Sequence, residues 1–201
     1  MEKKSFWRRT NRGFVVSMVL LAAVLVYVLV TQLMLVPVKN EVQALAQDLR
    51  GVIEEIATCS QDEAEALQDP DVYDQELDRI REKIRPLFTD DGYLDDTMGY
   101  METMLSDQVT RSQQVTVRKQ SKQQWRSCTV EEDTASVSLT YLYLVDGWFW
   151  DYQTEKPKEE SDKTQQLDLS ITCKKVDGVW KIYRVNQVMT YSYTTYGGDW
   201  Q

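Results

Sequence analysis

Histidine is absent from the sequence, and only three cysteines occur among its 201 residues. The absence of histidine excludes mechanisms that use a histidine general base and zinc sites with a histidine ligand. Cys59, Cys128 and Cys173 follow no spacing that indicates a disulfide framework, so the sequence leaves open whether any two of them pair. Cys173 stands among apolar residues, where a thiol is usually inert. We therefore expect no catalytic cysteine and no cofactor.

A metal site is not expected either. Four aspartates cluster before a predicted helix, at Asp90, Asp91, Asp95 and Asp96, but they lack the D-x-[DN]-x-[DN]-G spacing of a calcium loop. Carboxylates in a turn and a first helical turn are favoured by capping and by the helix dipole. We therefore assign these aspartates to helix capping.

A run without charge extends from Phe14 to Val36, over 23 residues. At ~1.5 Å per residue a helix of this length reaches ~34 Å, which is enough to cross a hydrocarbon core of ~30 Å. The run therefore predicts a transmembrane helix. A buried helix of a soluble protein is the alternative, although such helices are rarely apolar on all sides over six turns.

The flanks of this run predict its orientation. Five basic residues and Glu2 give the preceding segment a net charge of +4, whereas Lys39 and Glu41 cancel after it. The positive-inside rule then places the N-terminus in the cytoplasm and the rest of the chain outside the plasma membrane. A cleaved signal peptide is the alternative, but it needs a shorter apolar region and a small-residue cleavage site.

The residues beyond the run carry a net charge of −13 within a chain total of −9. Such a surface repels phosphate, which argues against nucleic acid or anionic lipid headgroups as partners of the outer domain. About 165 residues suit one domain with a genuine core.

An apolar seam of helical spacing follows the run, within residues 37–60; its members are Val42, Leu45, Leu49, Val52 and Ile56. It predicts either a short coiled-coil stalk that pairs two copies or an amphipathic helix on the domain's own sheet, and we favour the latter. A second helix is predicted to start with Asp69 as N-cap and Pro70 at its first position, and to end at Pro86. A third helix carries Leu94, Met98, Met101 and Leu105 on one side.

From about residue 115 the sequence becomes rich in Val, Thr, Tyr and Trp, which indicates strands. We expect a first strand within 115–130 that is interrupted at 119–124, then strands at 135–145, 165–176 and 179–188, with a loop at 146–164. Asp177-Gly178 predicts a type I′ hairpin, in which positions whose numbers sum to 355 face each other. This register puts Arg184 opposite Ile171 and Asn186 opposite Leu169, on the core side of the sheet.

Helices followed by a meander of about four antiparallel strands predict an α+β fold, with helices packed on one side of a curved sheet. The segments VSLTYLYLV, LDLSITCKK and VDGVWKIYRV resemble the strand half of the nuclear-transport-factor-two-like superfamily, over roughly residues 70–190. The resemblance implies a curved sheet that wraps helices into a cone. We expect the α+β domain at 61–190 and an aromatic tail at 191–201, which contains Tyr191, Tyr193, Tyr196 and Trp200.

Two candidate sites follow. The resemblance implies a ligand pocket inside the cone, and the residues that would line it are Tyr141, Tyr143, Arg184 and Asn186. The alternative, which we favour, is that Arg184 lies near the open end of the sheet and reaches solvent or an acid of a helix. A second group of aromatics at the start of the expected loop suggests either a protein contact surface or a lid over the core; its members are Trp148, Phe149, Trp150 and Tyr152.

The order of basic tail (1–13), one membrane helix (14–36) and cone domain is similar to that of inner-membrane assembly factors of type IV secretion and conjugation systems. This likeness implies a non-catalytic bacterial membrane protein that binds a protein partner or associates with itself. The alternative is a small-molecule-binding module, or an isomerase or dehydratase that uses acids and tyrosines in the cone.

Overall fold

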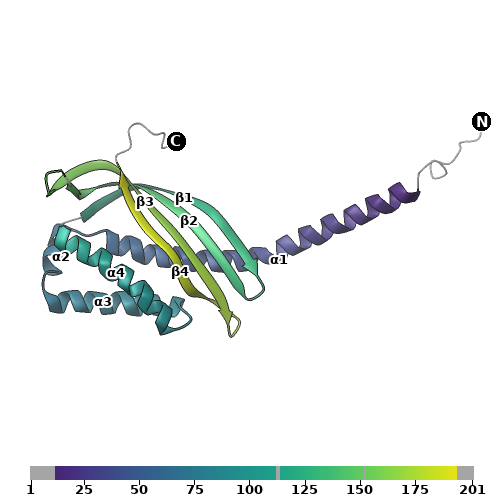
Figure 1. The fold of residues 1–201 in the computed structure, drawn as a ribbon, viewed down its shortest axis with the longest axis horizontal. Coiled ribbons are helices and arrows are strands. Elements are labelled where there is room, and N and C mark those ends of the chain that lie inside the picture. Colours follow the sequence, from purple (N-terminus) through teal and green to yellow (C-terminus); the bar gives the residue numbers. More distant parts are fainter. Residues whose placement is uncertain (1–11, 112–113, 152, 194–201) are drawn as a thin grey trace, which may run out of the picture. The chain divides into compact units, whose positions relative to one another are not determined.

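The computed structural model describes residues 12–111, 114–151 and 153–193. The chain divides into two compact units, Met1–Asn40 and Glu41–Gln201, which are treated separately below. In chain order the elements are helices followed by four strands, and the strands form one antiparallel sheet in the order β1-β2-β3-β4 (Figure 1). The α+β class predicted from the sequence is confirmed.

Helix α1 (Arg12–Ala57) supplies the described part of the first unit. It is long and apolar enough to cross a membrane, and no part of its apolar window is buried. A core helix of a soluble protein would bury most of this surface, and this helix does not. The polar side chains of Ser17 and Thr31 donate to the carbonyl oxygens of Gly13 and Tyr27, at 2.9 and 2.8 Å. These hydroxyls are therefore satisfied within the helix, as a lipid environment requires.

The same helix continues through Pro37 and contributes its last turns to the core of the second unit. Val42, Leu49, Val52 and Ile56 of the predicted seam are each at most 5% exposed. The seam is buried within its own domain, so it is not available to pair two copies as a coiled coil. The amphipathic-helix interpretation is the correct one of the two.

Three further helices complete the helical layer: α2 (Gln61–Ala66), α3 (Pro70–Ile84) and α4 (Asp91–Arg111), with a short 3-10 turn, η2 (Arg85–Leu87), after α3. Asp69 caps α3 by accepting from the backbone N–H of Asp71, as predicted. Helix α2 was missed, although Ser60 and Glu63 form a reciprocal capping box, which is a sequence signature of a helix start.

The strands are longer than the sequence analysis predicts: β1 (Gln114–Glu131), β2 (Thr134–Asp151), β3 (Lys156–Val176) and β4 (Val179–Tyr193). Strand β1 runs through the expected interruption at 119–124 and absorbs it in bulges. The expected loop at 146–164 is wrong, because β2 and β3 pair as far as Asp151 and Lys156. At the bulge in this hairpin Asp146 accepts from the backbone N–H of Asp162 at 2.9 Å, which satisfies a donor that the ladder leaves free.

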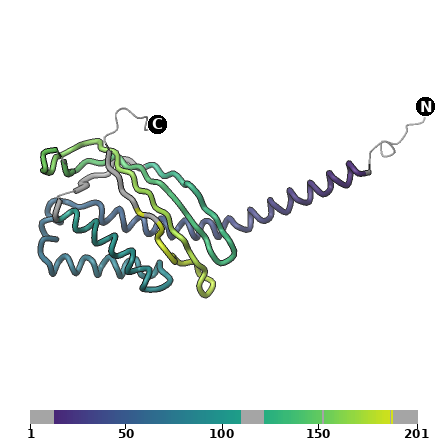
Figure 2. The backbone as a smooth tube through the Cα atoms, in the orientation of Figure 1, coloured from purple at the N-terminus to yellow at the C-terminus, as the bar shows by residue number. Residues whose placement is uncertain are grey.

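The predicted hairpin at Asp177-Gly178 is confirmed, with φ of 50° and 84° at the two turn residues. Its register holds from Val176↔Val179 to Cys173↔Ile182 and then shifts at two bulges in β4. Arg184 therefore pairs with Thr172 rather than Ile171, and its placement on the core side is wrong. The backbone trace shows how β4 crosses the helical layer at the edge of the sheet (Figure 2).

Two glycines give a matched test of the turn. Gly178 has a φ of +84°, Gly99 lies in α4, and a Cβ at either position meets no atom within 4 Å. We expect Gly178→Ala to lower the free energy of unfolding by about 1 kcal/mol, because L-residues disfavour this φ. Gly99→Ala should raise it by about 0.5–1 kcal/mol through helix propensity. Urea denaturation followed by tryptophan fluorescence measures both, and equal effects of the two variants would contradict the type I′ turn.

Candidate functional site

The interior of the second unit contains a polar cluster that joins α1 to β2. The side chains of Arg50 and Glu54, each 23% exposed, form an ion pair at i,i+4 spacing on α1. Tyr143 donates a hydrogen bond to the same Glu54 carboxylate, and the Arg50 guanidinium lies 4.3 Å from the centre of the Tyr141 ring. The two tyrosine rings stack at 5.9 Å, and Tyr141 donates to the side chain of Gln123 on β1.

The side chains of this cluster interact with one another and with neighbouring protein groups. The tyrosines are 5% and 2% exposed, and both hydroxyls are engaged with protein acceptors. Burial, opposed by Arg50, raises the pKa of Tyr141 above its ordinary value, so this phenol stays protonated at neutral pH. The arrangement supports a structural role for the cluster, which connects the sheet to the helix beneath it.

The sequence analysis identified Tyr141 and Tyr143 but assigned them the wrong cation. Their partner is Arg50 of α1, whereas on β4 Arg184 lies between the two bulges and Asn186 lies at the second one. A sequence signal for the true partner existed, because Arg50 and Glu54 have the i,i+4 spacing of a helical ion pair beside the buried seam.

Arg184 and Asn186 instead line a shallow cavity of about 240 Å³ between α4 and β4. Tyr93, Asp96 and Tyr100 of α4 line its other wall. Asn186 donates from Nδ2 to the Thr172 hydroxyl at 2.8 Å, and Tyr93 and Tyr183 share a hydrogen bond of 2.5 Å between their hydroxyls. The four predicted pocket residues therefore do not form one site: Tyr141 and Tyr143 lie in the polar cluster, and Arg184 and Asn186 line this cavity.

The aromatic residues predicted to form a contact surface also differ in their exposure to solvent. Phe149 is 7% exposed and lies under the Lys163 ammonium at 4.2 Å, whereas Trp148 is 38% exposed. Trp150 is half-buried and pairs with Pro157 across the hairpin. Tyr152 and the tail residues Tyr196 and Trp200 lie outside the described residues, as do the side chains of Tyr191 and Tyr193.

The helical layer carries the larger hollows. The largest of those described here, about 630 Å³, lies between the end of α1, α2, α3 and α4, and Ile56, Cys59, Leu67 and Leu105 contribute to its wall. A second, of about 430 Å³, lies on the other side of α2 and includes the exposed Trp148.

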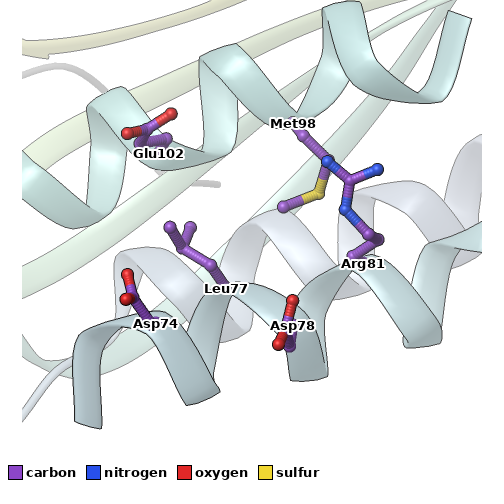
Figure 3. A pocket seen from close by; sticks show the side chains of 6 residues that line it. All are labelled: Asp74, Leu77, Asp78, Arg81, Met98 and Glu102. Atoms are coloured by element: carbon purple, nitrogen blue, oxygen red, sulfur yellow. The ribbon is translucent and has the colours of Figure 1, made fainter. Parts of the chain in front are cut away.

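A third hollow, of about 330 Å³, runs between α3 and α4 (Figure 3). Leu77 and Met98 extend into the space between the two helices, and the lining is completed by the carboxylates of Asp74, Asp78 and Glu102 and by the guanidinium of Arg81. Apolar side chains edged by carboxylates are thus a repeated feature of this layer.

Metal binding and thiol chemistry receive no support from the described part of the chain. No group of three or more Cys, Asp or Glu side chains there is arranged to hold a metal ion. Asp90 accepts from the backbone N–H groups of Gly92 and Tyr93, which confirms its capping role. Burial raises the pKa of Cys59 to about 11 and that of Cys173 to about 12, so neither is a thiolate at neutral pH.

Removal of one member of the buried ion pair tests the polar cluster. We expect Glu54→Gln to lower the free energy of unfolding by about 1–3 kcal/mol, because it leaves the Arg50 charge half-buried without its carboxylate. Arg50→Met combined with Glu54→Gln should cost less than the sum of the two single variants. Urea unfolding of the full chain in detergent measures this cycle. Glu55→Gln, whose side chain is 41% exposed, is the control and should cost less than 1 kcal/mol; strict additivity would argue against a coupled cluster.

Comparisons with known proteins assign no family. No protein-family model matches the chain, and no curated protein matches its sequence. One solved structure with partial likeness is a Xanthomonas campestris protein named for the calcium/calmodulin-dependent protein kinase II association domain. It is 17% identical, covers 51% of this chain and 56% of its own, and has a TM-score of 0.22. The chain thus spans about half the length of that structure, and a superposition at this TM-score carries no functional conclusion.

Proposed function

We propose that this chain is a non-catalytic, single-pass membrane protein whose acidic domain lies outside the cytoplasm and binds a protein partner through its helical layer. The observation that carries the proposal is the exposed apolar part of α1, none of whose window is buried. A helix that exposes large apolar side chains over this length needs lipid to cover them.

The interior of the domain supports binding rather than catalysis. Arg50, Glu54, Tyr141 and Tyr143 are hydrogen-bonded, ion-paired or stacked with one another, and among the described buried side-chain atoms Arg50 Nε alone lacks a hydrogen-bond partner. The larger hollows lie instead on the helical layer, where a macromolecule has access. The nuclear-transport-factor-two-like cone is likewise our proposal for the fold family.

The setting we propose is a bacterial membrane complex of the secretion or conjugation type, with the domain held at the outer side of the plasma membrane. It rests on the order of a basic tail, one apolar helix and an α+β domain, together with the net charge of +4 that precedes the helix. The core of the domain begins at Val42, six residues after the apolar run ends at Val36. So short a connection favours a retained anchor over a cleaved signal peptide.

Single-cysteine labelling tests this topology. In a Cys128→Ser background the remaining native cysteines, Cys59 and Cys173, are each at most 4% exposed. We expect a membrane-impermeant maleimide to label Thr154→Cys in intact cells. It should label Ser5→Cys only after permeabilisation, because the positive-inside rule puts the N-terminus in the cytoplasm. The opposite pattern would reverse the orientation, and loss of the tagged N-terminus from the mature chain would show cleavage.

Cross-linking in the native membrane tests the partner. We expect an amine-reactive cross-linker, applied before solubilisation, to join the full-length chain to at least one other membrane or extracytoplasmic protein. A variant with an unrelated transmembrane helix in place of residues 14–36 is the control and should retain that partner if the outer domain makes the contact. Recovery of the monomer alone would argue against the proposal.

A further inference from the structure

The acidic residues of the protein are densest in one short segment, although residues 90–107 hold six further carboxylates and no basic residue. Residues 54–78 contain ten carboxylates and no lysine or arginine, whereas the net charge of the whole chain is −9. All other residues together therefore sum to +1. This segment forms the last turn of α1, all of α2 and the first half of α3, so the negative charge is concentrated on these three consecutive helical segments.

The hollow of about 630 Å³ lies within this segment. Ile56, Leu67 and Leu105 are between 2 and 8% exposed and contribute to its apolar wall, while Val72 of α3 is 39% exposed beside them. The volume falls in the range of about 300–1,000 Å³ that is usual for ligand sites. Apolar side chains of a partner could therefore be buried here.

The rim of this hollow is negatively charged. Arg79 is the only basic side chain among its described lining residues, and it is already paired with Glu55 at 2.8 Å and with Glu76 at 2.6 Å. Five further carboxylates on α2 and α3 lie outside this lining and form no ion pair with any described basic residue: Asp62, Glu65, Asp71, Asp74 and Asp78. These five carboxylates remain to attract a positively charged ligand.

The adjoining hollow extends the same surface. Gln108 of α4 lines both hollows, so they lie on either side of α2. The second one presents Trp148 beside Pro157, and its lining includes one acid, Glu65, and one base, Lys156. A half-exposed tryptophan is a common anchor in protein interfaces, and its face also attracts cations.

We infer that the hollow between α1, α2, α3 and α4 docks a basic amphipathic helix of a protein partner, with apolar side chains on its wall and Lys or Arg against its rim. This identifies the partner class for the membrane-associated binding proposed above and rests on that proposal. The argument is charge complementarity together with an apolar wall, which is the helix-in-groove mode of peptide recognition.

A second copy of this chain is a poor occupant. Among the described helices the segment richest in basic residues is the second half of α3, where Arg79, Arg81 and Lys83 pair with acids of the same molecule. The apolar side chains between them, Ile80 and Ile84, are fully buried. This helix therefore has no apolar face to offer to another copy.

A site-specific photo-cross-linking experiment tests the inference. The full-length chain, in phosphatidylcholine nanodiscs, carries p-benzoylphenylalanine at Val72 inside the hollow or, as control, at the exposed Thr103 of α4. The probes are two 18-residue helical peptides with leucine on one face and either lysine or glutamate on the other. We expect the lysine probe to cross-link about fivefold more at position 72 than at 103, and the glutamate probe to show no preference.

Two pairs of variants define the site. Ala66→Trp, an exposed position that lines the hollow, should abolish cross-linking at 72, whereas Thr103→Trp should leave it unchanged. Glu65→Gln with Asp74→Asn should reduce it by about two- to fivefold, and Glu131→Gln with Glu159→Gln, which removes the same charge elsewhere, should not. The urea midpoint of each variant verifies folding.

The outcomes separate this inference from the proposed function. Equal cross-linking at both positions, equal yields for the two probes, or persistence in Ala66→Trp would overturn the docking site. In the native membrane, p-benzoylphenylalanine at Val72 should attach to a Lys- or Arg-rich helical segment of another protein. Attachment to a second copy or to an acidic segment would also overturn it, whereas a partner captured only elsewhere on the domain would leave the proposed function standing.

Discussion

The burial of the last turns of α1 against the sheet is the constraint on which the rest of the second unit depends. Val42, Leu49 and Ile53 are at most 1% exposed, so this helix lies within the core. Its seam is flanked by Arg50 and Glu54, which must enter the interior along with it. Two charges in a partly dry site are tolerated only where they pair and are hydrogen-bonded.

The tyrosines of β2 meet that requirement, and by doing so they occupy the interior. Tyr143 bonds to Glu54, and Tyr141 places its ring against Arg50. The space between the sheet and α1 could hold a ligand only if these side chains were replaced or displaced. The consequence is that the hollows accessible to a partner lie on the outer surface of the helical layer, where α2 separates two of them.

The sequence predicted those parts of the fold that depend on local chemistry. The N-cap at Asp69, the apolar side of α4 and the turn at Asp177-Gly178 are each determined by neighbours a few residues away, and each is confirmed. Helix α2 was predictable on the same grounds from its Ser60–Glu63 capping box. The extension of the β2–β3 hairpin could not be predicted in this way. Its tip is rich in Lys and Glu, which are not typical of strands, and its strand pairing depends on the partner strand.

Register was the main source of error at the candidate site. A strand alternates faces every residue, so one extra residue in β4 exchanges the faces of all that follow. The bulge after Ile182 moves Arg184 from the core side to a position opposite Thr172, and a second bulge follows within a few residues. Strand β4 is an edge strand, where bulges are common because they interrupt an otherwise exposed ladder. Nothing local in the residues around Arg184 specifies these bulges.

Local structure explains some of the acids in residues 54–78 but not all of them. Glu63 and Asp69 cap helices, and Asp71 benefits from the dipole at the start of α3. Asp74 and Asp78, by contrast, lie one turn apart on the same helix, where like charges destabilise by about 0.2–0.5 kcal/mol. Neither forms an ion pair within the described chain, although four basic residues follow directly in the sequence, at 79–85. Asp78 is offset in part by its attraction to Arg81, one turn further along the helix. Carboxylates that form no ion pair and border apolar hollows are consistent with the positively charged partner inferred above.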